Sequence, residues 1–193
     1  MDPVKTEDGY VSGTVIGEPG KEVRIYRGIP YATPPVGDLR WRPPQPTASW
    51  TGIRECTAFS EIAPQSMIID SGFIGSMPQS EDCLYLNVLT PAKNTADRQP
   101  VMVWLHGGGY DMGNGNDSLI NAARLPQHGV VIVNVNMRLN VVGLMAHPLI
   151  SQESPDGVSG NYLFLDMIAA LKWVQKNIAA FGGDPGKIGR AHV

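Results

Sequence analysis

Two short, uninterrupted apolar runs constrain the fold of this chain more than any other feature. Residues 101–105 read VMVWL, and residues 130–135 read VVIVNV. Continuous runs of this kind are typical of strands buried on both faces in a mostly parallel sheet. A third segment, LYLNVL at residues 84–89, has the pattern of a half-buried strand. We therefore predict an α/β fold built on these strands.

Helical patterns alternate with the strands. Residues 160–183, GNYLFLDMIAALKWVQKNIAAFGG, place apolar side chains three or four positions apart and predict one long helix. The two closing glycines, followed by Pro185, predict its end. A shorter segment, SLINAARLPQHG at residues 118–129, predicts a brief helix ended by Gly129. The apolar face predicted for the long helix consists of Phe164, Ile168, Leu171, Val174, Ile178 and Phe181.

The region before these strands is irregular. The pieces GTVIG and EVRIYRGIPY look like short strands, whereas the Pro-rich residues 31–46 can form neither a long helix nor a central strand. Leu39, Trp41 and Trp50 offer apolar anchors in this stretch. We expect an ordered wrap over a surface here rather than a flexible linker. Residues 61–80 are predicted to form a loop.

Length and charge limit the functions to consider. The 193 residues suffice for one domain with a core. The 15 basic and 18 acidic residues give a net charge of −3, which argues against nucleic acid or an anionic membrane surface as the partner. The N-terminus lacks a secretion pattern, and no apolar run is long enough to span a bilayer. If Met1 is the native start, we expect a cytoplasmic protein. Oligomeric state leaves no signal in the sequence.

A glycine-rich loop follows the first apolar run. Residues 106–109 read His-Gly-Gly-Gly, directly after a predicted strand, which is where α/β sheets place their sites. A phosphate-binding loop would require a lysine and a hydroxyl residue after Gly113, but Asn114 and Gly115 stand there. Two interpretations remain: an oxyanion hole built from backbone N–H groups, as in esterases and lipases, or a tight turn without a chemical role.

Five blocks of this chain resemble the type-B carboxylesterases, a family that includes the cholinesterases. The resemblance covers residues 10–186 and implies an α/β-hydrolase fold. It also implies hydrolysis of a small-molecule carboxylic ester by a Ser-Glu/Asp-His triad, with no metal or organic cofactor. In chain order, the blocks are YRGIPYATPPVGDLRWRPPQP, SEDCLYLNV, PVMVWLHGGGY, VNMRLNVVGLM and GNYLFLDMIAALKWVQKNIAAFGGDP.

The resemblance assigns roles to the residues of the glycine loop. Gly108 and Gly109 would donate two oxyanion-hole N–H groups. His106 would support the loop through side-chain hydrogen bonds, since the triad histidine of family members lies far downstream. Tyr110 and Asp111 would line the acyl or entry side of the gorge, although plain packing is an equal alternative for Tyr110.

Two ion pairs are also implied by the resemblance. Arg40 would pair with Glu81, and Arg138 would pair with Asp166. Arginine suits bidentate pairing with a carboxylate in a partly buried position. We expect both pairs to hold the architecture rather than to take part in the chemistry.

The cysteines and one loop depart from the family pattern. Family members commonly have a cysteine at the position of Ala63, so Cys83 lacks its expected disulfide partner. A bridge from Cys83 to Cys56 and two reduced thiols both remain open. The loop at residues 64–79 lacks the tryptophan with which cholinesterases bind choline, so we do not expect choline ester specificity.

The nucleophile motif is also missing. G-x-S-x-G does not occur in the chain; Ser159 has glycine two positions before it but Asn161 two positions after it. We interpret residues 1–186 as the N-terminal portion of an α/β-hydrolase domain, truncated before the nucleophile-bearing strand. We interpret residues 187–193, KIGRAHV, as a non-native tail from sequencing-adapter read-through, because the corresponding codons can spell an adapter. Strand 130–135 would then have an open edge.

A non-catalytic cholinesterase-like binding or adhesion protein is the alternative to an enzyme. Such relatives are typically extracellular and disulfide-bonded. The intact HGGG, the missing disulfide and the missing secretion signal favour the esterase.

We expect the 193-residue chain, expressed alone, to fold poorly, because an open apolar strand edge favours aggregation. We also expect it to hydrolyse no esters, because the triad residues are missing. The measurement is turnover of a short aryl ester by pure protein. Turnover that a serine-directed inhibitor abolishes would contradict this expectation.

Overall fold

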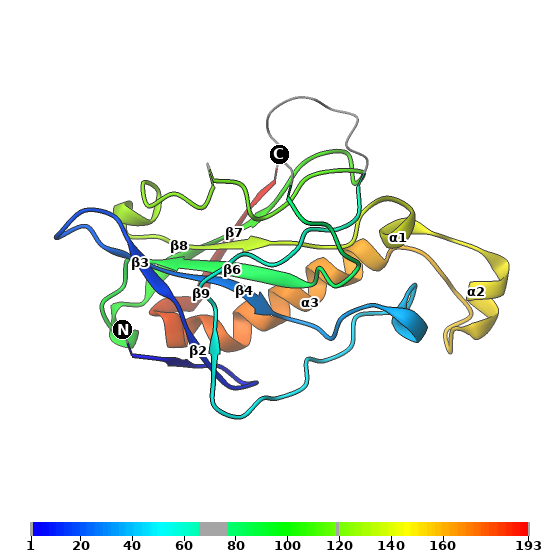
Figure 1. Cartoon of the computed structure of the whole chain (residues 1–193), viewed down its shortest axis with the longest axis horizontal. Helices are drawn as coiled ribbons and strands as arrows, with labels where there is room; N and C mark the ends of the chain where they lie inside the picture. The colour runs from blue at the N-terminus through cyan, green and yellow to red at the C-terminus, as the bar shows by residue number, and fades with distance from the viewer. Residues whose placement is uncertain (1, 66–76, 119, 193) are drawn as a thin grey trace.

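The computed structural model describes residues 2–65, 77–118 and 120–192, and its centre is a six-stranded mixed sheet (Figure 1). The strands lie in the order β3-β4-β6-β8-β7-β9. The pairs β3–β4, β4–β6 and β6–β8 are antiparallel, whereas β8, β7 and β9 run parallel to one another. Their bounds are β3 Thr14–Ile16, β4 Val23–Pro30, β6 Tyr85–Thr90, β7 Gln99–Leu105, β8 Val131–Val135 and β9 Gly183–His192.

A smaller sheet and several helices complete the described structure. The smaller sheet has the order β1-β2-β5. Helix α3 lies along one face of the large sheet (Figure 1), and the larger apolar core fills the space between them. The bounds of these elements are β1 Val4–Lys5, β2 Tyr10–Ser12, β5 Ile53–Glu55, α1 Asn140–Leu144, α2 Pro148–Glu153 and α3 Tyr162–Asn177, with 3₁₀ helices η1 Gly37–Leu39, η2 Thr95–Asp97, η3 Pro126–His128 and η4 Ile178–Phe181.

The three strands predicted from apolar runs are confirmed as β6, β7 and β8. All five residues of β8 are buried, as a strand covered on both faces requires. The expectation that this strand has an open edge is wrong. β8 pairs with β6 on one side and with β7 on the other, and it is β7 that receives β9.

The edge of the described sheet is therefore β9, whose register pairs Val101 with Ile188 and Val103 with Arg190. Residues 187–192, which belong to the predicted non-native tail, lie in this edge strand. Lys187 and Arg190 place charges on it, and charged side chains hinder pairing between sheet edges. The expectation of poor folding rested on an open apolar edge at residues 130–135, and this strand is paired on both sides.

The helix predicted over residues 118–129 is also wrong. In the described part of this stretch, turns lead to the single 3₁₀ turn of η3, which Gly129 ends at φ 83°. Pro126 has no N–H for a helical hydrogen bond and its ring crowds the preceding turn. The Asn121 side chain donates to the carbonyls of Gly115 and Asp117. Side-chain bonds of this kind compete with a helix.

Helix α3 forms as predicted and continues into η4, which ends at Gly182 in the left-handed conformation. The predicted apolar face is correct at Val174 and beyond but wrong in the first half. Phe164 and Ile168 are 38% and 48% exposed. The inward positions there are taken by Leu163, Met167 and Ala170, together with Asp166. Apolar residues surround this half of the helix, so their spacing alone does not select the buried face.

The Pro-rich stretch is an ordered strap without long regular elements. The indole N–H of Trp41 donates to the Val141 carbonyl at 3.0 Å, and that of Trp50 donates to the Tyr10 carbonyl at 2.9 Å. The guanidinium of Arg138 donates to the Arg42 carbonyl at 2.8 Å. These bonds hold the strap against the end of β8 and the small sheet.

Both expected ion pairs are present, in different surroundings. Arg138 and Asp166 have fully buried side chains, with Nη2–Oδ1 at 2.6 Å and Nε–Oδ2 at 2.8 Å. The backbone N–H of Arg138 donates to the same carboxylate at 3.1 Å. The Arg40–Glu81 pair lies near the surface, with Nε 2.8 Å from Oε2 and side chains 42% and 26% exposed.

Cys56 and Cys83 are both free and buried. Within the described ranges, no helix is long and apolar enough to cross a membrane. The same part of the chain contains no group of three or more His, Cys, Asp or Glu residues placed to hold a metal ion.

We expect Asp166→Asn to lower the free energy of unfolding by about 3–5 kcal/mol, because it leaves the buried charge of Arg138 without a counter-ion. Urea unfolding of the chain measures the effect. Glu81→Gln is the matched control and should cost less than about 1 kcal/mol, since its pair is exposed. Equal losses in the two variants would contradict the importance of burial.

We also expect both thiols to resist Ellman's reagent in the folded chain and to react fully in urea without reductant. Burial raises the pKa of Cys56 to about 11 and raises that of Cys83 further. Because only the thiolate reacts, a raised pKa leaves little reactive species in mildly alkaline buffer. Absence of reactive thiols in urea would reveal a Cys56–Cys83 disulfide instead.

Candidate active site

The glycine loop begins where β7 ends, at Leu105, and it borders a cavity of about 340 Å³. The neighbouring parallel strand β8 ends at Val135, and the residues that follow it contribute Met137 and Leu139 to the lining. The cavity thus lies at the carboxyl ends of two adjacent parallel strands, the usual position of a site in an α/β sheet. Its lining consists of His106, Gly107, Gly108, Gly109, Tyr110, Met137 and Leu139.

The glycines of this loop are required by contacts as well as by conformation. Gly108 has φ 116°, and a Cβ there would collide with the Met112 carbonyl. Gly113 has φ 114°, and a Cβ there would collide with the His106 ring and the Gly107 carbonyl. Gly109 has φ 64° and faces open space. The loop therefore folds tightly on itself and leaves the Gly109 side open.

Two anchored carbonyls fix the direction of two N–H groups. The Gly107 carbonyl accepts from His106 Nδ1 at 2.9 Å, and the Gly108 carbonyl accepts from the N–H groups of Asp111 and Met112 at 3.1 and 3.2 Å. The described peptide bonds are trans, and in a planar trans peptide the C=O and N–H point in opposite directions.

The N–H groups that share these peptides belong to Gly108 and Gly109. They point away from the interior of the loop, and both residues line the cavity. Among the described residues, neither N–H donates to a protein acceptor. Two adjacent, preoriented donors in a cavity can bind one oxygen atom that carries negative charge.

His106 is committed to the loop. It is 6% exposed, and as the donor to the Gly107 carbonyl its Nδ1 carries the proton. Its ring occupies the space beside Gly113 where a Cβ would lie. The structure therefore brings His106 together with the three glycines.

Tyr110 and Asp111 differ in position. Tyr110 lines the cavity, and its ring packs edge-on against Phe164 with centroids 5.4 Å apart. Tyr110 therefore combines a position in the cavity lining with a packing contact to α3. Asp111 is exposed and does not belong to the lining, so its side chain does not contribute to the cavity in the described structure. The four residues of the two expected ion pairs also lie outside the lining.

A layer of buried asparagines beneath the loop was missed in the sequence. Asn136 accepts from the Gly115 N–H at 2.7 Å, while Asn87 and Asn121 donate to the Gly115 carbonyl at 3.0 and 2.8 Å. Asn116 accepts from both Asn87 and Asn136. The available signal was asparagine inside otherwise apolar strands, because a buried amide needs partners.

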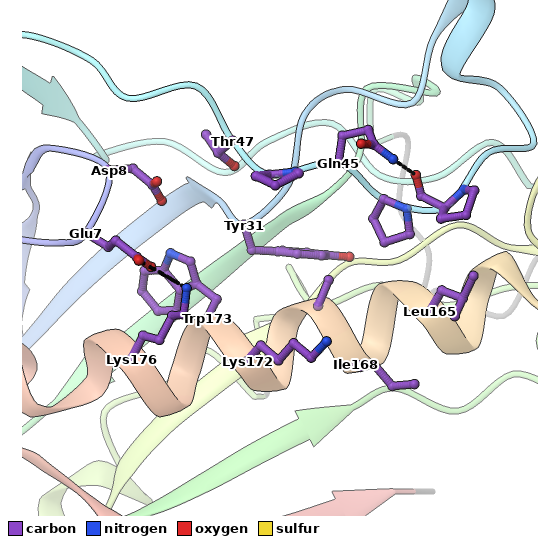
Figure 2. Close-up of a pocket in the computed structure, with 14 residues that line it drawn as sticks. Glu7, Asp8, Tyr31, Gln45, Thr47, Leu165, Ile168, Lys172, Trp173 and Lys176 are labelled. Carbon is purple, nitrogen blue, oxygen red and sulfur yellow. Dashed lines mark hydrogen bonds and ion pairs between the residues drawn. The ribbon is translucent and has the colours of Figure 1, made fainter. Parts of the chain in front are cut away.

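A second cavity, of about 360 Å³, lies between α3 and the Pro-rich strap (Figure 2). Its charged residues are Glu7, Asp8, Lys172 and Lys176, and Glu7 forms an ion pair with Lys176. The described residues that line it include no serine, cysteine or histidine. Its lining comes mainly from α3, the strap and the N-terminal residues rather than from the carboxyl ends of β7 and β8, so the glycine-lined cavity is the candidate site.

Known proteins with related sequences include esterases. A family model described as the carboxylesterase family matches residues 2–189. The chain is 48% identical over 179 residues to the fumonisin B1 esterase of Sphingopyxis macrogoltabida, covering 92% of this chain and 32% of the relative. It is 41% identical over 190 residues to the para-nitrobenzyl esterase of Bacillus subtilis (strain 168), covering 96% and 36%. The chain thus spans about a third of the length of these relatives.

Solved structures give the same result. A PNB esterase superposes with a TM-score of 0.86 at 39% identity, covering 99% of this chain and 38% of that one. The Geobacillus stearothermophilus carboxylesterase superposes with a TM-score of 0.83 at 37% identity, covering 98% and 38%. The mixed sheet with α3 on its face is accordingly part of an α/β-hydrolase fold.

Proposed function

The chain belongs to the carboxylesterase family, and from this membership we propose that the protein containing it hydrolyses a small-molecule carboxylic ester. The observation that carries the proposal is the pair of preoriented N–H groups at Gly108 and Gly109. Their carbonyl partners are tied down by His106 and by the turn at Asp111 and Met112. The family supplies the reaction class, and the loop geometry supports its oxyanion step.

In the proposed reaction, a serine hydroxyl attacks the carbonyl carbon of the ester while a histidine takes the hydroxyl proton. The carbonyl oxygen becomes an oxyanion and accepts from the N–H groups of Gly108 and Gly109. When the C–O bond to the alcohol breaks, the histidine returns the proton to the leaving oxygen. Water then repeats the sequence on the acyl-enzyme and releases the carboxylic acid.

The 193 residues supply the electrostatic half of this scheme. Each oxyanion donor stabilises the transition state by about 2.7–4 kcal/mol. The triad serine, its acid and its histidine are assigned to a part of the protein outside these residues, since G-x-S-x-G is absent from them. His106 acts as loop support in this scheme, because its Nδ1 is engaged with the Gly107 carbonyl. The scheme uses no metal or organic cofactor.

The cavity walls support an apolar acyl or alcohol group next to the oxyanion site. Met137 and Leu139 line the same cavity as the glycines, and Tyr110 adds an aromatic surface. Fumonisin B1 and p-nitrobenzyl esters enter the test panel because two relatives are named for them. Short p-nitrophenyl esters complete the panel as general probes.

The test uses the protein translated from the complete gene. We expect hydrolysis of at least one ester in the panel and labelling by a serine-directed fluorophosphonate. We expect Gly108→Ala to lower kcat by about 100- to 1,000-fold, because a Cβ there displaces the peptide that carries one donor.

Gly157→Ala is the matched control, since Gly157 also has positive φ, 67°, in open space and lies outside the cavity lining. It should leave kcat unchanged. A complete, folded protein that neither hydrolyses these esters nor takes up the label would instead support the non-catalytic binding alternative.

A further inference from the structure

Gln65 approaches the glycine loop from a distant part of the chain and is almost fully buried, at 9% exposure. Its side-chain amide pairs with both backbone groups of Gly113. The Gly113 N–H donates to Oε1 at 2.8 Å, and Nε2 donates to the Gly113 carbonyl at 3.0 Å. Nε2 also donates to the Ala63 carbonyl at 3.1 Å. The side-chain amide thus makes the same pair of hydrogen bonds with Gly113 that the backbone of a neighbouring strand would make.

Gly113 transmits this restraint to the candidate site. The space that its missing side chain leaves is filled by the His106 ring and the Gly107 carbonyl. Gln65 binds the N–H and C=O groups of Gly113, and the His106 ring packs against the Cα of Gly113. A shift of Gly113 therefore moves the ring whose Nδ1 fixes the Gly107 carbonyl. That carbonyl belongs to the peptide that carries the Gly108 N–H.

A second connection joins the same segment to another point in the loop, Tyr110. The Asn140 side chain donates to the Pro64 carbonyl at 2.6 Å, and the Asn140 N–H donates to the Tyr110 carbonyl at 2.8 Å. Residues 63–65 are therefore linked to the loop at two points after Gly109, at Tyr110 through Asn140 and at Gly113 directly.

The segment that carries Gln65 is itself held in place. The Gln65 N–H donates to the Gln79 side chain at 2.8 Å. Ile62 donates to the Pro78 carbonyl at 3.0 Å and accepts from the Ser80 N–H at 2.9 Å. These bonds fix the backbone of residues 62–65, so the Gln65 side chain is held beside Gly113.

We propose that Gln65 is a positioning residue for the oxyanion site, acting through Gly113 and His106 on the peptide between Gly107 and Gly108. This inference rests on the proposed function. The position requires glutamine because it needs one donor and one acceptor side by side. Methionine supplies neither, and ionised glutamate supplies two acceptors, one of which would face the carbonyls of Gly113 and Ala63.

The test uses the complete protein and an ester that the wild type hydrolyses. We expect Gln65→Met to lower kcat about 10- to 100-fold with little change in KM, because misplacement of the N–H weakens binding of the oxyanion and not of the ground-state ester. An aryl trifluoromethyl ketone, which forms an oxyanion adduct with serine, should lose affinity by the same factor. Gln127→Met is the matched control, because Gln127 is exposed, lies outside the cavity lining and donates from its side-chain amide to the Lys21 carbonyl.

Gln65→Glu supplies a readout that general loss of structure does not give. Protonation of the introduced carboxyl restores a donor beside an acceptor, so the ratio of variant to wild-type kcat should rise as the pH falls. The pH dependence of this ratio tests the positioning role of Gln65 even where Gln65→Met fails to fold.

Two results would overturn the inference in distinguishable ways. An active wild type with unchanged kcat and ketone affinity in Gln65→Met, or a Gln65→Glu ratio independent of pH, removes the role of Gln65 alone. An inactive, unlabelled wild type removes the proposed function, and the positioning role is lost with it.

Discussion

The buried pair of Arg138 and Asp166 connects the parts of this structure that must be held together. Arg138 follows β8 by three residues, Asp166 lies on α3, and the same guanidinium reaches the strap at the Arg42 carbonyl. Taking both charges out of water is costly, and the cost is met only by a complete set of partners. The pair therefore fixes the chain beyond β8. Met137 and Leu139, which flank Arg138 in the sequence, belong to the lining of the candidate site.

The glycine-rich loop, which also lines this cavity, is held in a different way, because side chains from other segments position its main chain. His106, Gln65 and the asparagine layer all bind backbone groups of the loop at residues 106–115. Glycine permits the sharp turns, but it also removes the side-chain packing that would normally limit backbone motion. Rigidity must then come from hydrogen bonds supplied by other segments, and the structure supplies them from residues 63–65, from β6 and from the residues after β8.

The extent to which the sequence predicts this arrangement depends on the kind of interaction. β7 and β8 were predictable because their apolar runs leave few alternatives, and the HGGG motif marked the loop because three glycines in succession have few uses. The inward face of α3 was not predictable at Phe164 and Ile168, because apolar residues surround that half of the helix. The helix predicted at residues 118–129 is wrong because Asn121 bonds the Gly115 and Asp117 carbonyls, and the sequence pattern does not reveal these competing bonds. The role of Gln65 depends on a contact across 48 residues, which spacing does not reveal.

The use of peptide N–H groups as the donors has a consequence for how such a site responds to acidity. A peptide N–H does not ionise over the range in which proteins stay folded, in contrast to histidine, lysine or tyrosine. The Gly108 and Gly109 donors therefore keep the same charge distribution in acid and in base. Substitution of their own side chains cannot tune them either, since they have none. Under the proposed function, acidity alters the turnover of the natural enzyme through ionisable groups outside this donor pair.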